Sequence, residues 1–595
     1  MAKTKVAEKP GRQTGAKVIA VPALKDSKEF KIGSRSIVVS NEDLICTGLL
    51  LLLMYIIYSI RSNFLLIPFE RDEGIYSYFG NLILDGKTPY KDFYEVKFPG
   101  LFYFFATIVA IFGDTVKGMH TGFMYVNMLT ALFVYLASRK LFSPIAGIVS
   151  ATTFAFVSLT PTLSGFTVQA EHGVAFFISI GVYCYSVARA NNKWYSYLVM
   201  GAAMGMAFMT KTSGIFLAFW GALIILTDWF FTKPRTFKAL LINMFSYGGG
   251  GILIVASFFL LMASKGVFSD MIFWTYEHPK SYINSMPFEE GVKYFKYTRD
   301  AIIQNHKLFW FHSVAAIGLC LLKPANIKLK IFGITLFGLS FMTIVPGYYF
   351  YGHYWIQTVP GLSIVAGLTV YSVLGILRTY FKLVQPRYGY IYLGIFAVLT
   401  FNHASNMKGY YFHPNYERIL RATYGNNPFP ESMEIANYIN ANSKPEDNIV
   451  LLGSEPQIYF YTKKRCPSRH AYFTALVNNI PAHHQWQREF AKDVEKAKPK
   501  FVIFFNHPLS LLVQPNTDKY VFEWANKFIS ENYHIVGLVD MIEGQQSVYV
   551  YNEKMNTYKP VSQNLIYIYE RNAGPSAINT AATNTTTTTT TTPKP

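Results

Sequence analysis

Charged residues are scarce in this chain of 595 residues. Asp, Glu, Lys and Arg together make up 15% of it, whereas soluble domains average roughly 25%. Hydrophobic residues reach 51% and aromatic residues 17%, which is more apolar surface than one globular core can bury. The composition excludes an ordinary soluble protein and indicates a polytopic membrane protein whose surface is partly covered by lipid.

Acidic residues and cysteines are few as well. The 35 Asp and Glu against 54 Lys and Arg leave a net charge of +19, which is typical of a membrane face or of nucleic-acid binding. The chain has no zinc-ligand spacing and no basic helix long enough to read a groove, so we expect no nucleic-acid partner. Its four cysteines exclude a disulfide scaffold, because all but Cys466 lie in apolar runs. It also lacks the internal repeat that marks many transporters.

Apolar runs long enough to cross a bilayer, or nearly so, occur eleven times. They are 44–67, 119–137, 144–163, 173–189, 195–212, 213–231, 238–262, 308–323, 329–345, 354–376 and 388–404. The run 100–113 is short for a span and predicts an interfacial or re-entrant helix. Residues 1–43 are polar and basic without periodicity, which predicts a disordered cytoplasmic tail. The expected transmembrane domain is therefore 44–404.

Loop charges predict the orientation, because short cytoplasmic loops carry an excess of Lys and Arg. With the basic tail inside and 100–113 left uncounted, every cytoplasmic loop is basic. These loops contain Arg139 and Lys140, Arg189 and Lys193, Lys233 to Lys238, Lys323 to Lys330, and Arg378 to Arg387. We expect a multi-pass protein of the plasma (inner) membrane, with the first outer loop, 68–118, and everything after 405 on the extracytoplasmic side.

The chain after the last span reads as a small domain. Helical patterns at 430–442, 485–498 and 518–531 alternate with strand patterns at 448–453, 501–505 and 534–539, and the aromatic run 459–461 predicts a short edge strand. This alternation predicts an extracytoplasmic α/β domain over 413–571 with a partly parallel sheet. The Thr-rich end, 572–595, is of low complexity and is expected to be disordered.

The first outer loop holds the densest group of ionisable residues. Its acidic pair Asp72 and Glu73 begins a predicted helix over 72–84, on which Asp72 and Tyr76 share one face. An acidic residue in a first turn also stabilises the helix dipole. The segment alone therefore leaves two roles open for Asp72, helix capping and catalysis.

Further ionisable residues fall on the same predicted side. Glu171 begins a span, where a carboxylate could simply be solvated. Lys211 lies between two adjoining spans, which is costly unless it reaches water or meets an anion. His353 and Tyr354 open another span, and an interfacial aromatic belt accounts for the tyrosine but not for the histidine. A carboxylate base facing a group of cations is what displacement of a phosphate leaving group by a hydroxyl requires.

With these motifs in place, the sequence resembles the membrane-embedded C-type glycosyltransferases (GT-C fold), in particular the branch of protein O-mannosyltransferases and lipid A aminoarabinose transferases (glycosyltransferase family 39-like). The resemblance covers nearly the whole chain except its two tails. Its motifs are Asp72-Glu73 with Tyr76, Glu95-x-Lys97-x-Pro99-Gly100, Glu171, Gly201-x3-Gly205 through Lys211, His353-Tyr354-x2-Gln357-x2-Pro360, and Gly453-x2-Pro456-x2-Tyr459-Phe460. It implies a helical membrane fold of about eleven spans, with interfacial helices in the first outer loop and the soluble α/β domain.

The resemblance also implies an activity, which is inverting transfer of a hexose or pentose from a polyprenyl-phosphate donor to an acceptor hydroxyl on a protein, lipid or glycan. Catalytic roles would fall to Asp72, Glu73 and Glu171, with Asp72 as the base. Substrate binding, chiefly of the lipid phosphate, would fall to Tyr76, Lys97, Lys211, His353 and Tyr354. The family pattern allows, without requiring, a divalent metal ion at Glu95. Phe98-Pro99 stands where the aminoarabinose branch has two prolines, so the identity of the donor sugar does not carry over.

Two alternatives remain. An oligosaccharyltransferase would share the fold, but its Trp-Trp-Asp signature is missing from the C-terminal region. A lipid or glycan transporter or flippase would carry its charges at mid-span on broken helices, whereas the ionisable residues here lie mostly at span ends on one side.

Overall fold

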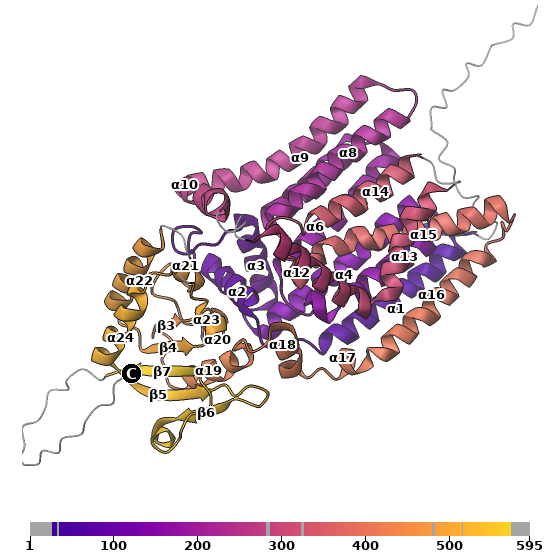
Figure 1. The fold of residues 1–595 in the computed structure, drawn as a ribbon. Helices are drawn as coiled ribbons and strands as arrows, with labels where there is room; N and C mark the ends of the chain where they lie inside the picture. Colours follow the sequence, from indigo (N-terminus) through magenta and orange to yellow (C-terminus); the bar gives the residue numbers. More distant parts are fainter. Residues whose placement is uncertain are drawn as a thin grey trace, which may run out of the picture.

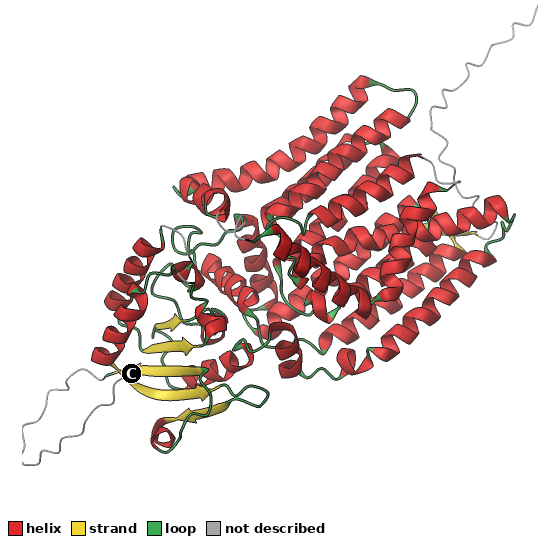
Figure 2. Cartoon of the chain, in the orientation of Figure 1, coloured by secondary structure: helices red, strands yellow, loops and turns green. Residues whose placement is uncertain are grey.

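The structure is a computed structural model, which describes residues 27–32, 35–280, 286–322, 327–478, 482–514 and 516–572. A long helical bundle carries a small α/β domain at one end (Figure 1). Figure 2 shows that most strands gather in that domain. The part of the predicted tail before residue 27 and the Thr-rich end from 573 lie outside the described residues.

All eleven apolar runs form helices, as the sequence predicts. They are α1 (Asn41–Ser62), α4 (Val116–Leu141), α5 (Pro144–Val157), α6 (Ala170–Asn191), α7 (Trp194–Thr210), α8 (Ile215–Phe231), α9 (Phe237–Ser264), α13 (Lys307–Leu321), α14 (Ile327–Met342), α15 (Val359–Tyr380) and α16 (Arg387–Asn406). Within the described residues, six segments are long and apolar enough to cross a membrane: 41–62, 116–141, 170–191, 212–231, 237–264 and 352–380. The chain is therefore a multi-pass membrane protein, and the count of eleven spans stays a prediction.

Two helices of the loop 68–118, α2 (Arg71–Leu84) and α3 (Pro99–Phe112), lie between the bundle and the α/β domain (Figure 1). Pro99 begins α3, where its missing N–H costs nothing. A Cβ on Gly100 would lie 2.6 Å from the carbonyl oxygen of Met209, so glycine is needed for α3 to approach the end of α7. Both helices thus rest on the bundle end that carries the predicted site.

Shorter elements complete the bundle. They are η1 (Pro161–Leu163), η2 (Thr212–Gly214), α10 (Phe268–Ile272), η3 (Phe273–Glu277), α12 (Phe288–Asn305), η4 (Gly352–Thr358), α17 (Lys408–Phe412) and α18 (Tyr416–Tyr424). Among these, η2 and η4 carry residues next to the predicted site, and a hydrogen bond of 2.8 Å from Ser213 Oγ to Gln357 Oε1 joins them.

The C-terminal domain has a five-stranded sheet in the order β3-β4-β7-β5-β6, in which only β3 and β4 pair in parallel. Its strands are β3 (Ile449–Leu452), β4 (Phe501–Asn506), β5 (Tyr533–Asp540), β6 (Val548–Tyr551) and β7 (Leu565–Arg571). Its helices are α19 (Phe429–Ala441), α20 (Gln457–Thr462), α21 (Thr474–Val477), α22 (His483–Ala497), α23 (Pro508–Leu511) and α24 (Tyr520–Asn532), with η5 (Asn552–Asn556) after β6. The partly parallel sheet is confirmed. The strands β6 and β7 were not expected from the sequence.

The expected edge strand over 459–461 is wrong, because these residues form α20. Its aromatic residues pack on the loop 68–118, with ring centroids of Tyr459 and Tyr78 5.3 Å apart and those of Phe460 and Phe69 5.4 Å apart. A Cβ on Gly74 would lie 2.4 Å from Cβ of Gln457, so α20 reaches α2 only because Gly74 has no side chain. Tertiary packing outweighs the strand preference of the aromatic run.

The tail also needs a correction. Two strands, β1 (Ser27–Ile32) and β2 (Arg35–Ser40), pair antiparallel inside the segment 1–43 that was expected to be disordered, and α1 begins at Asn41. The sequences SKEFKI and RSIVVS contain the β-branched and aromatic residues that favour strands. Composition averaged over the whole basic tail concealed this short pattern.

Candidate active site

The N-terminus of α2 is capped by glutamates. The Glu70 carboxylate accepts a hydrogen bond of 2.9 Å from the backbone N–H of Glu73, and the Glu73 carboxylate accepts one of 2.9 Å from the N–H of Glu70. Glu73 also accepts a hydrogen bond from the backbone N–H of Val168 and lies 3.3 Å from Nε2 of His120. Because all these contacts are buried, the geometry favours a structural role for Glu73 over the catalytic role expected of it.

Asp72 is left out of the capping arrangement. Glu70 is the N-cap residue, and the Asp72 carboxylate takes part in no hydrogen bond or ion pair within the described residues. Burial raises the pKa of Asp72, an effect that Lys97 and His353 oppose and Glu95 and Glu171 reinforce. Glu70, and not Asp72, is therefore the N-cap of α2, although Asp72 still lies in the first turn of the helix. Its role as a base stays a prediction.

One lysine next to Asp72 comes from the same loop, 68–118. Nζ of Lys97 lies 3.2 Å from Oε1 of Glu95 and 5.7 Å from the ring centroid of Tyr76. Burial opposes the charge on Lys97, but the nearby Glu95 and Asp72 carboxylates outweigh it and raise the pKa of Lys97. The side chain therefore stays cationic.

A second lysine comes from the junction of α7 and α8. Nζ of Lys211 pairs with Oε1 of Glu171, in the first turn of α6, and lies 3.6 Å from the ring centroid of Tyr354. His353 packs edge-on against Tyr354, with centroids 4.8 Å apart. The charge that would be costly between two spans is thus held by a carboxylate and an aromatic face.

These residues converge on one site. Electrostatic coupling links Asp72 with Lys97, His353, Glu95 and Glu171, which come from three separate parts of the chain, namely the loop 68–118, the start of α6 and η4. Of the site residues selected from the sequence, Glu73 is the exception, because its carboxylate contacts Glu70, Val168 and His120 and not this group. In chemical terms, the site combines an unpaired carboxylate with two lysines, each held by a carboxylate of its own.

Two residues near the site were missed. Arg71 reaches from α2 into the C-terminal domain, where it donates hydrogen bonds to the carbonyl oxygens of Ser454 (2.6 Å) and Leu509 (2.9 Å). Tyr472 of that domain is electrostatically coupled to Arg71 and Asp72. No sequence signal could pair Arg71 with partners that lie 383 and 438 positions later.

Comparison with solved structures decides the fold. The ArnT protein of Cupriavidus metallidurans in its apo state matches 88% of this chain and 98% of its own, with a TM-score of 0.54 at 13% identity. The chain has the C-type glycosyltransferase fold. The same ArnT bound to undecaprenyl phosphate matches with a TM-score of 0.51, also at 13% identity, over 88% of this chain and 97% of that one. The predicted fold class is confirmed.

Two further comparisons concern parts of the chain or weaker likenesses. Residues 96–262 match the family model described as dolichyl-phosphate-mannose-protein mannosyltransferase, a stretch of this C-type chain that contains Lys97, Glu171 and Lys211. An oligosaccharyltransferase of Archaeoglobus fulgidus matches 87% of this chain and 75% of its own, with a TM-score of 0.46 at 15% identity. A comparison with curated protein sequences finds no match.

Proposed function

We propose that this chain is an inverting membrane glycosyltransferase that moves a sugar from a polyprenyl-phosphate donor to an acceptor hydroxyl on the outer face of the membrane. The observation that carries the proposal is the unpaired Asp72 carboxylate beside the pairs Glu95–Lys97 and Glu171–Lys211. The C-type fold and the match to the mannosyltransferase family model support it, as does the undecaprenyl phosphate bound by the ArnT structure.

In the proposed reaction, Asp72 accepts the proton of the acceptor hydroxyl while that oxygen attacks the anomeric carbon. The bond between this carbon and the donor phosphate breaks, and the phosphate leaves with the bonding electrons. Lys97 and Lys211 lie where they can stabilise the charge that the leaving phosphate gains, and His353 and Tyr354 close the site beside Lys211. Attack opposite the leaving group inverts the anomeric centre.

The mechanism uses no metal ion. Glu95, the residue expected to lie near one, has its Oε1 committed to Nζ of Lys97 and to the backbone N–H of Val96 at 2.9 Å. An ammonium group within 3.2 Å of the carboxylate is a poor neighbour for a divalent cation, so the arrangement does not fit a metal at Glu95.

The transporter alternative requires charges at mid-span along a path. Here Asp72 lies in a helix of the outer loop, Glu171 at the start of α6 and Lys211 just after the end of α7. Charges at helix ends around one site favour a reaction at the membrane surface.

The direct test incubates purified protein with a panel of polyprenyl-phosphate sugars and candidate acceptors. We expect mass spectrometry to detect released polyprenyl phosphate with at least one pair, and proton NMR to show the opposite anomeric configuration in the product. Donor cleavage with retained configuration would contradict the mechanism. Sugar translocation across vesicles without cleavage would favour the transporter.

A first prediction concerns the phosphate site. Lys97→Ala and Lys211→Ala should each weaken donor binding by roughly ten- to hundred-fold, because a lost hydrogen bond to a charged group is worth about 1.5–3 kcal/mol. Titration of a fluorescent polyprenyl-phosphate analogue would measure this. Exposed Lys492→Ala is the matched control and should bind normally. Unchanged affinity in both site variants would move the phosphate site elsewhere.

A second prediction tests the orientation in a background without native cysteines. Single cysteines at Lys91 and Lys444, both exposed, should react with a membrane-impermeant thiol reagent in intact cells, because both positions are expected outside. A cysteine at exposed Arg235 should react only after the cells are permeabilised. The reverse pattern would overturn the proposed orientation.

A further inference from the structure

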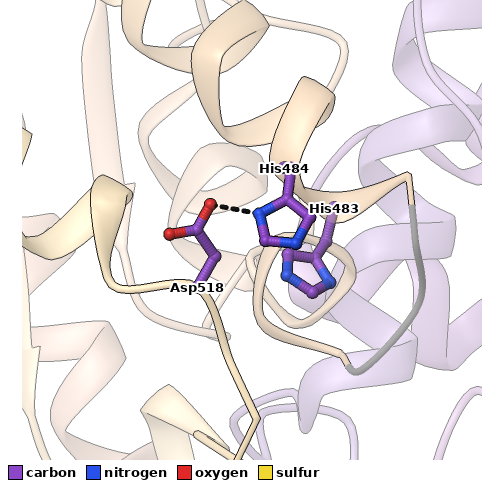
Figure 3. Close-up of side chains that lie close together, drawn as sticks. All are labelled: His483, His484 and Asp518. Carbon is purple, nitrogen blue, oxygen red and sulfur yellow. Dashed lines mark hydrogen bonds and ion pairs between the residues drawn. The ribbon is translucent and has the colours of Figure 1, made fainter.

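A cluster of metal-binding side chains lies in the C-terminal domain. His483 and His484 begin α22, and Asp518 precedes α24; their rings and carboxylate gather at one point (Figure 3). The candidate ligand atoms of all three lie within 4.8 Å of one another, and no other part of the chain that the structure describes brings three His, Cys, Asp or Glu so close.

We propose that His483, His484 and Asp518 form a zinc site. Two imidazoles and one carboxylate are a donor set that Zn²⁺ accepts, with water completing its four-coordinate shell. Imidazole nitrogen also favours Zn²⁺ over Mg²⁺ and Ca²⁺, which prefer sites made of oxygen alone. The site goes beyond the proposed transfer reaction and takes no part in it.

The segments that carry the ligands are already fixed to one another. Gln487, one turn after His483, is fully buried; its Nε2 donates 2.9 Å hydrogen bonds to the carbonyl oxygens of Asp518 and Leu476, and its Oε1 accepts one of 2.9 Å from the N–H of Val521. These bonds hold the beginning of α24 against α22. A supporting shell of this kind is what keeps metal ligands in place.

Within the cluster, Asp518 and His484 share a proton at the position where the ion would bind. Oδ2 of Asp518 lies 2.5 Å from Nδ1 of His484, while Oδ1 accepts a hydrogen bond of 3.0 Å from the N–H of Tyr520. A metal ion between Oδ2 and the imidazole would replace that proton and leave the Tyr520 contact intact. Arg488 is the nearby cation, 3.7 Å from Oδ2, but its side chain is 56% exposed and lies over the ring of Tyr520, so it can turn away.

The position of the cluster suggests what the ion would do. Two residues after His484, the ring of Trp486 packs against Trp274 of η3, with centroids 4.8 Å apart, and Trp274 stacks on Tyr94 at 3.7 Å. Tyr94 precedes Glu95 of the candidate active site. Zinc would therefore fix the beginning of α22, the helix whose Trp486 joins the C-terminal domain to η3 and, through Trp274, to Tyr94 of the loop 68–118.

The test uses the full chain, purified without a histidine tag and stripped with a chelator. Zinc titration against a chromogenic competitor should show one tight equivalent per chain, and His484→Gln and Asp518→Asn should each weaken it at least about tenfold. The asparagine side chain keeps an oxygen for the Tyr520 N–H, so the Asp518→Asn variant should fold. The control His534→Gln alters an exposed histidine whose Nδ1 lies 3.0 Å from Asn572 Oδ1 and should bind zinc as the wild type does.

A second readout locates the ion without relying on activity. Saturating Zn²⁺ should slow hydrogen exchange in 482–490 and 516–521 of the wild type, but not of Asp518→Asn. The proposal is overturned if no equivalent binds, if both variants bind as tightly as the wild type, or if protection appears elsewhere. Binding that His534→Gln weakens as much as His484→Gln would mean adventitious zinc on surface histidines only.

Discussion

Asp72→Asn is expected to lower the rate of sugar transfer by about 10²–10⁴-fold, the usual worth of general-base assistance, while donor affinity and fold stay intact. Asparagine has nearly the same shape but cannot take the proton of the acceptor hydroxyl. The fold should tolerate the change, because Asp72 makes no hydrogen bond or ion pair within the described part of the chain and Glu70 caps the helix. Initial rates at saturating donor, together with thermal unfolding, would measure both effects.

Glu73→Gln is the matched control, because it changes the neighbouring carboxylate in the same way. Glu73 is buried with the N–H groups of Glu70 and Val168 and with His120 around it. We therefore expect lower thermal stability and a nearly normal rate per folded molecule. An active Asp72→Asn beside an inactive, folded Glu73→Gln would make Glu73 the base. If both variants are active, Glu95 and Glu171 become the first candidates.

Much of the fold follows from the sequence, because lipid imposes simple rules. Apolar length identifies a helix that can span, and all eleven apolar runs are helical in the structure. Periodicity likewise identifies α19, α22 and α24 in the C-terminal domain. Sequence patterns fail to predict secondary structure where contacts between distant segments determine it. An example is α20, a helix that packs on α2 at Gly74.

The site shows the same division. The sequence could identify four of the site residues, because ionisable residues are rare in an apolar chain and a charge near the membrane is costly unless it has a function or a partner. These residues are Asp72, Lys97, Glu171 and Lys211. Their pairing could not be predicted, since Glu171 meets Lys211 across two helices. Asp72 and Glu73 have different surroundings because only Glu73 contacts Val168 and His120, and spacing along the chain does not reveal that.

Arg71 shows how the C-terminal domain is coupled to α2, the helix that carries Asp72. Its Nη2 lies 3.4 Å from Oε1 of Glu455, whose side chain is fully buried. Burial raises the pKa of Glu455 to about 7, although Arg71 and a hydrogen bond from Ser510 act in the opposite direction. Removing one partner of a buried ion pair typically costs about 3–5 kcal/mol, because the other charge is left without compensation.

Arg71→Met should therefore lower the thermal stability strongly, and more so in alkali than in acid. The folded-state pKa of Glu455, about 7, lies above its ordinary value of about 4.3, so the folded state keeps the proton between these values and stability falls as pH rises through that range. Above pH 7 the stability of the wild type should level off, because Glu455 is ionised and paired, whereas Arg71→Met should keep losing up to about 1.4 kcal/mol of unfolding free energy per pH unit.

Unfolding midpoints in detergent at pH 6 and pH 9 would show this difference, and adding Glu455→Gln to Arg71→Met should remove it. A deficit that is equal at both pH values, or that survives in the double variant, would mean that Arg71 acts through its bonds to Ser454 and Leu509 and not through the charge of Glu455.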